Sequence, residues 1–547
     1  MFRSMGTKVT VVISRAMVLR VATHIAAWLP FLAVMASSRR GEWRVVGDGA
    51  GIASRSWGVL AGHVPLVGQP TQLARGVYDP GPLQYWLLAL PVHIDPVRGV
   101  LWGAALWCMV AASLAIEAAW SVLGGAGGLL ASGTILWMVA WTPKLATKPY
   151  WNPWFGALFF VAALAACWAV MAGRRWWWPA GVITASVAAQ AHLMFAVASA
   201  ALVFLALIVG LVDAFRAKAG YLWALIGLCA GMGCWAAPFL QQFTSRHGNL
   251  TALLHAQGIG RRTGFSFALK TLTASTQPPP LWWPVHQAAS VARLIDGRSA
   301  VVAVAVLGVT AAVVLLAMFE LRSRPLAALA AVSLLADAAA LVTFSHIPAR
   351  NVDLAKLGYL IIVMFPVGLL AWFTVGSAVV LTVWEVSVRL RGRAAGHAEP
   401  HDGHPGAARA WARWAAGAAG IAAVPLIVLG SFPGAVQRMA AFPANAQQAK
   451  AVSAVSRMIE RATPSQPIAL AVAGANVHYC RRLGLGIAWA LDANGYHPDL
   501  DKRPTHERRM PQVTILLQST GIDVDITSAA GRVAEVTSEP RPPFHSS

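Results

Sequence analysis

Long apolar runs, each close to the length that crosses a bilayer, recur along most of the 547-residue chain. A transmembrane helix needs roughly 20 predominantly apolar residues. The first run is not predicted to be a cleavable signal, because Arg20 and His24 interrupt it and no small-residue cleavage site precedes the polar loop after it. The pattern predicts eleven spans, at residues 16–36, 97–120, 127–143, 153–172, 176–192, 194–212, 220–238, 300–319, 325–344, 358–388 and 415–431.

The tail after the last run has a different pattern. Helical and alternating periodicities replace the long apolar runs, and they predict helices near 444–462 and 477–494 and strands near 468–472, 513–518 and 532–536. The predicted fold is therefore an all-α polytopic membrane domain of about eleven transmembrane helices (residues 1–431), followed by a small soluble α/β domain (432–547).

Basic residues orient this arrangement. The N-terminus and the arginine-containing stretch 389–413 are expected on the cytoplasmic side by the positive-inside rule. If 358–388 is one long helix, the linker 389–414 is cytoplasmic, and the long loops 37–96 and 239–299 and the C-terminal domain are extracytoplasmic. If it is instead a re-entrant pair, the C-terminal domain moves to the cytoplasmic side.

Composition supports a multi-pass plasma-membrane protein. Hydrophobic residues make up 57% of the chain, charged residues 12%, and the mean hydropathy is +0.58. The net charge of +21 comes from bases scattered over the membrane-flanking turns, which favours anionic lipid head groups over nucleic acid. The histidines of the linker are read as part of a flexible segment. No cofactor is expected, and the residues do not support a divalent metal.

Two carboxylates lie in the long loop after the first span. Asp48 stands in Gly47-Asp48-Gly49 just beyond the predicted lipid boundary, and Asp79 precedes Pro80-Gly81-Pro82. Each has an ordinary interpretation. Asp48 fits a solvated turn, and Asp79 fits the N-cap of a short helix that ends near Ile94. Each also fits a catalytic group, and the two interpretations stay open.

Four segments, in order and spacing, resemble the GT-C superfamily of integral-membrane glycosyltransferases. The similarity is to an actinobacterial branch of the protein mannosyltransferase and lipid A aminoarabinose transferase type, and it covers most of residues 10–380. The segments are GDGA…GHVPLVGQPTQLARGVYDPGPLQYWLLALP, WTPKLATKPYWNPWFGALFF, AAQAHLMFAV and PFLQQFTSRHGNLTALL.

The resemblance implies an inverting transferase that takes a sugar from a polyprenyl-phosphate donor on the outer face of the membrane. Such transfer needs a carboxylate to take the acceptor's proton and cations to stabilise the leaving phosphate. Asp48 matches the family's acidic loop residue and is the candidate base. Asp79 departs from the family, which has histidine or lysine there. The departure argues against a phosphate-binding role and leaves contact with acceptor hydroxyls as the alternative to a catalytic one. The acceptor is expected to be an envelope glycan, lipid or protein.

Basic residues of other external turns are the candidates for phosphate binding, because arginine binds phosphate in bidentate fashion and lysine as a point charge. Ordinary head-group contact is the alternative for them. His192, at a break between two spans, is a further substrate-binding candidate, or simply bonds the backbone. The predicted substrate-binding residues are Arg55, Lys144, Lys148, His192, Arg350 and Lys356.

A transporter or flippase of lipid-linked saccharides is the alternative function. Asp337 and Glu117 are acids within predicted spans that proton coupling could use. Against this, the sequence shows no inverted repeat and no pair of broken helices in corresponding halves. An enzymatic function is therefore preferred.

Overall fold

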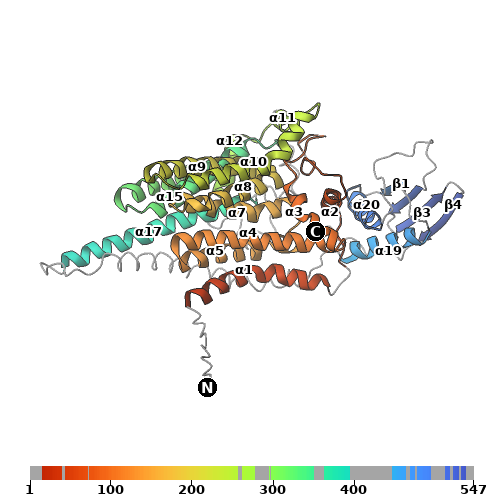
Figure 1. Ribbon diagram of the computed structural model, residues 1–547, viewed down its shortest axis with the longest axis horizontal. Helices are drawn as coiled ribbons and strands as arrows, with labels where there is room; N and C mark the ends of the chain where they lie inside the picture. The colour runs from red at the N-terminus through yellow and green to blue at the C-terminus, as the bar shows by residue number, and fades with distance from the viewer. Residues whose placement is uncertain are drawn as a thin grey trace, which may run out of the picture.

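Apolar helices lie side by side along the long axis of the molecule in the computed structural model (Figure 1). The structure describes residues 15–39, 43–71, 73–74, 76–256, 261–277, 295, 297–349, 362–394, 446–462, 469–474, 477–494, 512–517, 522–528 and 531–537. The bundle helices are α1 (Arg15–Arg39), α4 (Gly99–Leu123), α5 (Gly125–Trp141), α7 (Asn152–Met171), α8 (Trp178–Ala191), α9 (Ala196–Ala217), α10 (Tyr221–Thr244), α14 (Ala300–Leu315), α15 (Arg324–Ser345) and α17 (Met364–Ala394).

Eight helices of the described chain are long and apolar enough to cross a membrane, judged by length and composition. Helices α5 and α8 are shorter, at 17 and 14 residues. Every predicted span except 415–431 therefore has a helix, with ends shifted by a few residues. The span 415–431 and the linker from residue 395 lie outside the described residues.

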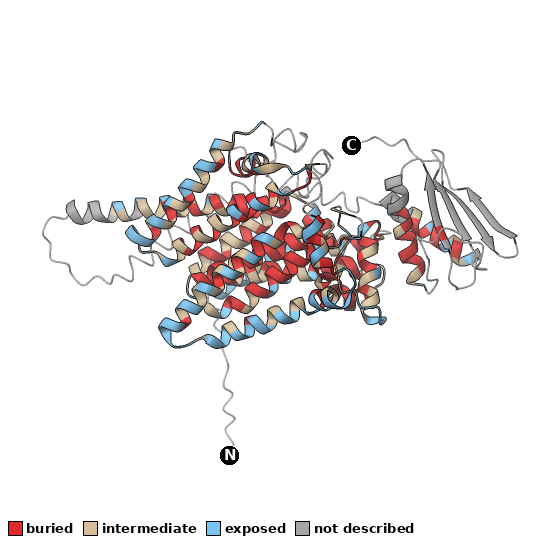
Figure 2. Cartoon of the chain, turned by 90° about the horizontal axis from the view of Figure 1, so that it is seen from above, coloured by how far each residue is buried: buried red, intermediate tan, exposed pale blue. Residues whose placement is uncertain are grey.

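Burial is highest in the middle of the bundle. Helix α7 is buried along almost its whole length, while α1, α9, α10 and α14 turn many apolar side chains outward (Figure 2). Outward apolar side chains are favourable in a membrane, where the surrounding lipid is itself apolar. The exposed set includes Leu29, Phe204, Met232 and Val304.

The two ends of the bundle differ. One end, called here the loop end, carries α2 (Asp48–Leu60), α3 (Leu83–Ile94), the short α6 (Lys144–Thr147), α11 (Asn249–Ala256) and α12 (Gly264–Thr276). The other end, called the opposite end, consists of short turns. There Trp168 Nε1 donates to Pro325 O (2.9 Å) and Arg174 Nε donates to Ser121 O (2.8 Å), so the ends of α4 and α7 and the start of α15 lie together.

Helix α17 settles one alternative left open by the sequence. Residues 364–394 form a single α-helix of 31 residues, not a re-entrant pair, and it projects past the other helices at the opposite end (Figure 1). At 1.5 Å per residue it is about 46 Å long, longer than the roughly 30 Å hydrocarbon core.

The C-terminal elements form a small α/β unit at the loop end (Figure 1). Strand β1 pairs parallel with β2, and β2, β3 and β4 follow as antiparallel neighbours. The sequence predicted these elements except β3, and the predicted boundary at residue 432 lies outside the described residues. The elements are α19 (Ala446–Ala462), β1 (Ala469–Gly474), α20 (Val477–Asp492), β2 (Gln512–Leu517), β3 (Ile522–Ser528) and β4 (Gly531–Thr537).

Helix α20 packs on the loop 37–96. Trp489 Nε1 donates to Pro96 O (3.1 Å), and the Trp489 ring lies edge-on to Trp57 of α2 with centroids 6.0 Å apart. Arg44 Nε also donates to Ser453 Oγ of α19 (3.2 Å). The C-terminal unit therefore lies on the same end of the bundle as the loop 37–96.

Candidate functional site

The four sequence segments that carry the resemblance meet at the loop end. Trp151 Nε1 of the second segment donates to Asp48 Oδ2 of the first (3.1 Å). Asp79, also of the first, accepts from Asn152 of the second and Leu193 of the third. Tyr78 N donates to Asn249 Oδ1 of the fourth segment (3.0 Å). Segments separated by up to 171 positions thus form one hydrogen-bonded cluster.

Asp79 is at the centre of this cluster. Its side chain is 4% exposed, with Oδ2 accepting from Asn152 Nδ2 (3.0 Å) and Oδ1 from Leu193 N (3.2 Å). Burial raises the pKa of Asp79 from 3.8 to about 7, although both hydrogen bonds favour the charged form. The carboxyl group is therefore poised between its two protonation states near neutral pH.

The N-cap interpretation of Asp79 is wrong. Helix α3 begins at Leu83 with Pro82 as its N-cap, and no side chain caps it. The carboxylate of Asp79 instead binds an N–H group at the start of the 3₁₀ turn Leu193–Phe195, more than a hundred residues away. Gly81 allows this close approach, because a Cβ there would lie 2.1 Å from Gln190 Oε1.

Asp48 differs from Asp79 in being exposed. It is the first residue of α2, a helix that the sequence did not predict, and it stands beyond the end of α1. The glycines on either side of Asp48 allow the turn and the close packing at this position. Gly47 has φ +61°, which favours glycine, and a Cβ on Gly49 would lie 2.5 Å from the Tyr150 ring.

Gln69 connects the backbones of the two acids. Its side-chain Nε2 donates to Asp48 O (3.5 Å), a long contact, and its carbonyl accepts from Asp79 N (2.7 Å). Arg55 supports the same loop from α2, donating from Nη1 to Gly68 O (2.7 Å) and to Tyr85 Oη (3.2 Å). Its guanidinium also lies over the rings of Tyr78 and Tyr85, at 5.6 and 5.7 Å. The structure therefore gives Arg55 a supporting contact with the loop, beside its predicted substrate role.

The Lys144–Lys148 turn lies on the same side of the bundle as Asp48. It forms the short helix α6 after α5, and Lys144 is exposed. Three residues after Lys148, Trp151 makes the hydrogen bond to Asp48. Arg350 and Lys356 lie outside the described residues. The residues before Arg350 are at the loop end, where Ala349 N donates to Arg261 O (2.8 Å) and Thr263 N donates to Ile347 O (3.0 Å).

His192 occupies the break between α8 and the start of α9. Its backbone is extended, and its Nδ1 accepts from Met194 N (3.3 Å), so the backbone-bonding interpretation describes this contact. Its neighbour Leu193 provides the N–H group for Asp79.

Sequence reasoning missed the neutral partners of the two acids: Gln69, Trp151, Asn152 and Asn249. Trp151 and Asn152 stood inside a segment quoted for the resemblance, but only its lysines were selected, because charge was the criterion. Asn249 holds the loop from α11, with Nδ2 donating to Tyr78 O (3.1 Å). Neutral amides leave no signal in charge or periodicity, and only the fold shows which acid they contact.

Two acids of bundle helices lie away from this cluster, Glu117 partly exposed and Asp337 buried. Glu117 of α4 pairs with Arg20 and accepts from His24 Nε2 of α1 (2.7 Å). Asp337 of α15 is fully buried, and among the described residues neither of its carboxyl oxygens has a hydrogen-bond partner.

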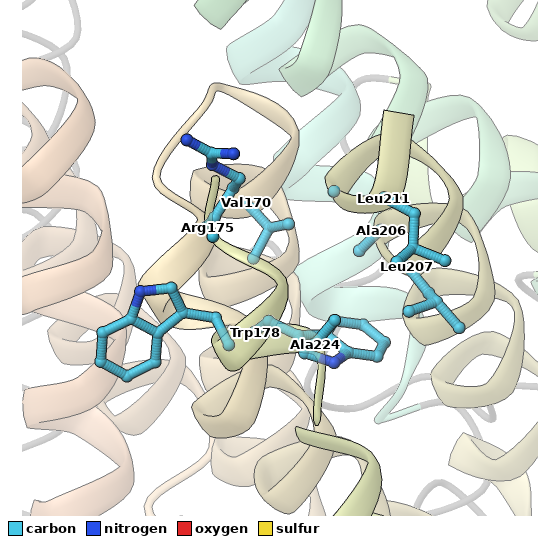
Figure 3. Close-up of a pocket in the computed structure, with 10 residues that line it drawn as sticks. Val170, Arg175, Trp178, Ala206, Leu207, Leu211 and Ala224 are labelled. Carbon is cyan, nitrogen blue, oxygen red and sulfur yellow. The ribbon is translucent and has the colours of Figure 1, made fainter. Parts of the chain in front are cut away.

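A small, partly open recess lies between α7, α8, α9 and α10 at the opposite end (Figure 3). It is lined almost wholly by apolar side chains, with Arg175 as its single charged residue. It is separate from the cluster around Asp48 and Asp79, since its lining comes from the turns at the other end of the bundle and from the adjoining parts of α7, α8, α9 and α10.

Comparison with protein-family models and with curated proteins gives no match. Among solved structures, the crystal structure of ArnT from Cupriavidus metallidurans in the apo state is similar to the chain at 15% sequence identity and a TM-score of 0.45. The alignment covers 91% of this chain and 92% of that one. Identity and score are both too low for the likeness to assign a function.

Proposed function

We propose that the chain is a membrane glycosyltransferase that moves a sugar from a polyprenyl-phosphate donor to an envelope acceptor at the loop end. Asp48 is the general base, and Lys144 and Lys148 contact the donor phosphate. Arg350 and Lys356 belong to the same proposed phosphate site. The acceptor is a hydroxyl of an envelope glycan, lipid or protein.

The proposed reaction is a direct displacement with inversion. The acceptor hydroxyl oxygen forms a bond to the anomeric carbon while the bond from that carbon to the phosphate oxygen breaks. The hydroxyl proton passes to Asp48, and the electron pair of the broken bond stays on the polyprenyl phosphate, whose developing charge the lysines stabilise. The buried carboxylate of Asp79 stabilises the loop by accepting hydrogen bonds from Asn152 and Leu193.

The observation that carries this proposal is the hydrogen bond between Trp151 and Asp48. It joins an exposed carboxylate to the segment that contains Lys144 and Lys148, at the ends of helices long enough to span a membrane. A lipid-linked sugar phosphate lies at that height, with its prenyl chain in the hydrocarbon and its phosphate at the interface. A base and cations are therefore available on the same side of the bundle.

A transfer assay in detergent tests the proposal. Purified full-length protein is incubated with a polyprenyl-phosphate-linked pentose or hexose and a hydroxyl acceptor, and the glycosylated acceptor is measured by mass spectrometry. Transfer with inverted anomeric configuration supports the proposal. Absence of transfer across donors and acceptors, with donor movement in proteoliposomes, would replace it by the transporter.

One observation favours that transporter as the second candidate function. Asp337 is fully buried in a bundle helix, and its carboxyl oxygens have no partner among the described residues. Such a group is costly in a membrane and is often functional. Transport requires a closed compartment, so activity in detergent distinguishes the two candidates.

A further inference from the structure

The residues that line the recess extend from the turns of the opposite end along helix α9. Arg175 and Gly220 lie in the turns at its mouth, whereas Ala206 lies eleven residues before the end of α9, about 16 Å further along that helix. The recess encloses little space of its own and is partly open at the surface.

Arg175 stands at the mouth of this recess (Figure 3). Its Nη1 donates to the backbone carbonyls of Asp213 (3.3 Å) and Ala219. The carboxylate of Asp213 is paired with Arg324. A guanidinium has five N–H donors, and both of these bonds use the same nitrogen, so donors remain for an anion.

Exposed aromatic side chains indicate that the mouth of the recess lies at the level of the lipid head groups. Trp176, Tyr221 and Trp223 are exposed around it, as tryptophan and tyrosine are at membrane–water interfaces. Trp178 lines the recess and is 4% exposed, and its indole N–H has no hydrogen-bond partner in the described part of the chain. Basic residues also outnumber acids in the turns of this end, where Arg174, Arg175, Arg216, Lys218, Arg322 and Arg324 accompany Asp213 and Glu320.

We propose that this recess binds one phospholipid with a net negative head group, whose phosphate contacts Arg175 and whose acyl chain lies along Leu207 and Leu211. The positive charge of Arg175 at the mouth attracts the phosphate, and the apolar lining below it packs against the acyl chain. The site is independent of the transferase proposal, because it lies at the other end of the bundle.

Native mass spectrometry of the delipidated full-length protein tests the proposal. The probes are dioleoyl phosphatidylglycerol and dioleoyl phosphatidylcholine, which share acyl chains and differ in net charge. Wild-type protein should bind one phosphatidylglycerol about fivefold or more tightly than phosphatidylcholine, the gain typical of one basic residue near an anionic head group. Equal binding of the two lipids would overturn the proposal.

Arg175→Gln should abolish this preference, and Arg175→Lys should retain most of it because it keeps the charge. Arg216→Gln is the matched control, since Arg216 is exposed at the same end and does not line the recess. An equal loss in Arg175→Gln and Arg216→Gln would mean that diffuse surface charge, and not the recess, attracts the lipid.

A second pair of variants tests the acyl-chain contact in the recess without changing charge. Gly210 lines the recess, and a Cβ there meets only Val170 Cγ1 at 3.4 Å, so Gly210→Leu can fold while filling the recess. It should weaken the binding of both lipids at this site. Gly233→Leu is the control, because Gly233 is exposed on α10 with open space around it. Unchanged lipid binding in Gly210→Leu would contradict the proposal.

Discussion

At the scale of single residues, the two carboxyl groups of the loop end differ in exposure and in partners. Asp48 is exposed and bonded to one indole N–H, as suits a group that exchanges a proton with a substrate. Asp79 is buried, and it accepts from donors on two other elements. The sequence placed both in one loop and offered no means of telling the exposed acid from the buried one.

The buried acid predicts a pH-dependent stability. Because burial raises the pKa of Asp79 from 3.8 to about 7, the folded protein keeps a proton that the unfolded chain has lost between these values. Stability should therefore fall as pH rises through this range and level off above it. Thermal unfolding in detergent at about pH 5 and about pH 8 measures the difference.

Asp79→Asn, which stays neutral, should reduce that difference. The matched control is Asp95→Asn. Asp95 accepts from Val97 N and Arg98 N through Oδ1, and an amide oxygen keeps both bonds. The variant loses only the charge of the long, partly exposed contact between Asp95 Oδ2 and Arg98 Nη1 at 3.9 Å. If Asp79→Asn keeps the full wild-type pH dependence, Asp79 does not titrate in this range.

The lysine turn has its own prediction. Lys144→Gln should raise the KM for the polyprenyl-phosphate donor about tenfold, since a charge-assisted contact with phosphate contributes roughly 1.5–3 kcal/mol. The KM for a water-soluble acceptor should change much less. Lys218→Gln, an exposed lysine of the opposite end, is the control. Equal changes in both variants would mean that Lys144 only attracts lipids in general.

At the scale of elements, the spans were predictable because each is a long apolar run. The helices and most strands of the tail were predictable because their apolar residues recur with regular helical or alternating spacing. The helix α2 was not, since Asp48–Leu60 contains three glycines and two serines and has no long apolar run. It is held in place by tertiary contacts, such as Gly49 against Tyr150 and Trp57 against Trp489. Those contacts join distant parts of the chain and are invisible to local patterns.

Two glycines of α2 test whether this packing positions the site. In Gly49→Ala the new Cβ would lie 2.5 Å from Tyr150 Cε2 and 2.6 Å from Val45 Cγ2, so α2 must shift. We expect a lower melting temperature and reduced transfer. Gly51→Ala, two positions on, meets nothing within 4 Å and should be neutral or gain roughly 0.5–1 kcal/mol. If both variants behave alike, close packing at Gly49 is unimportant.

At the scale of the whole molecule, topology follows from the positions of the ends. The first helix begins and α17 ends at the opposite end, while α20 contacts the loop end. The predicted span 415–431 lies between α17 and α20 in the sequence. Which end faces the cytoplasm stays a prediction from the positive-inside rule, and it places the C-terminal unit outside the cell.

Cysteine labelling in spheroplasts checks this orientation. In a chain whose five native cysteines are replaced by alanine, Lys450→Cys on α19 should react with a membrane-impermeant maleimide without permeabilisation. Lys218→Cys at the opposite end should react only after permeabilisation. Both positions are exposed, so the reverse pattern would invert the topology.

Transfer by an Asp48→Asn variant tests the central claim most directly. The amide has the shape of the carboxylate but does not take a proton, and a general base contributes roughly 10²–10⁴-fold, so kcat should fall at least about a hundredfold. Donor affinity and thermal stability should stay near those of wild type, and Asp95→Asn should keep its activity. An Asp48→Asn variant that retains more than about half of wild-type kcat, far above the loss expected for a general base, would show that Asp48 is not the base.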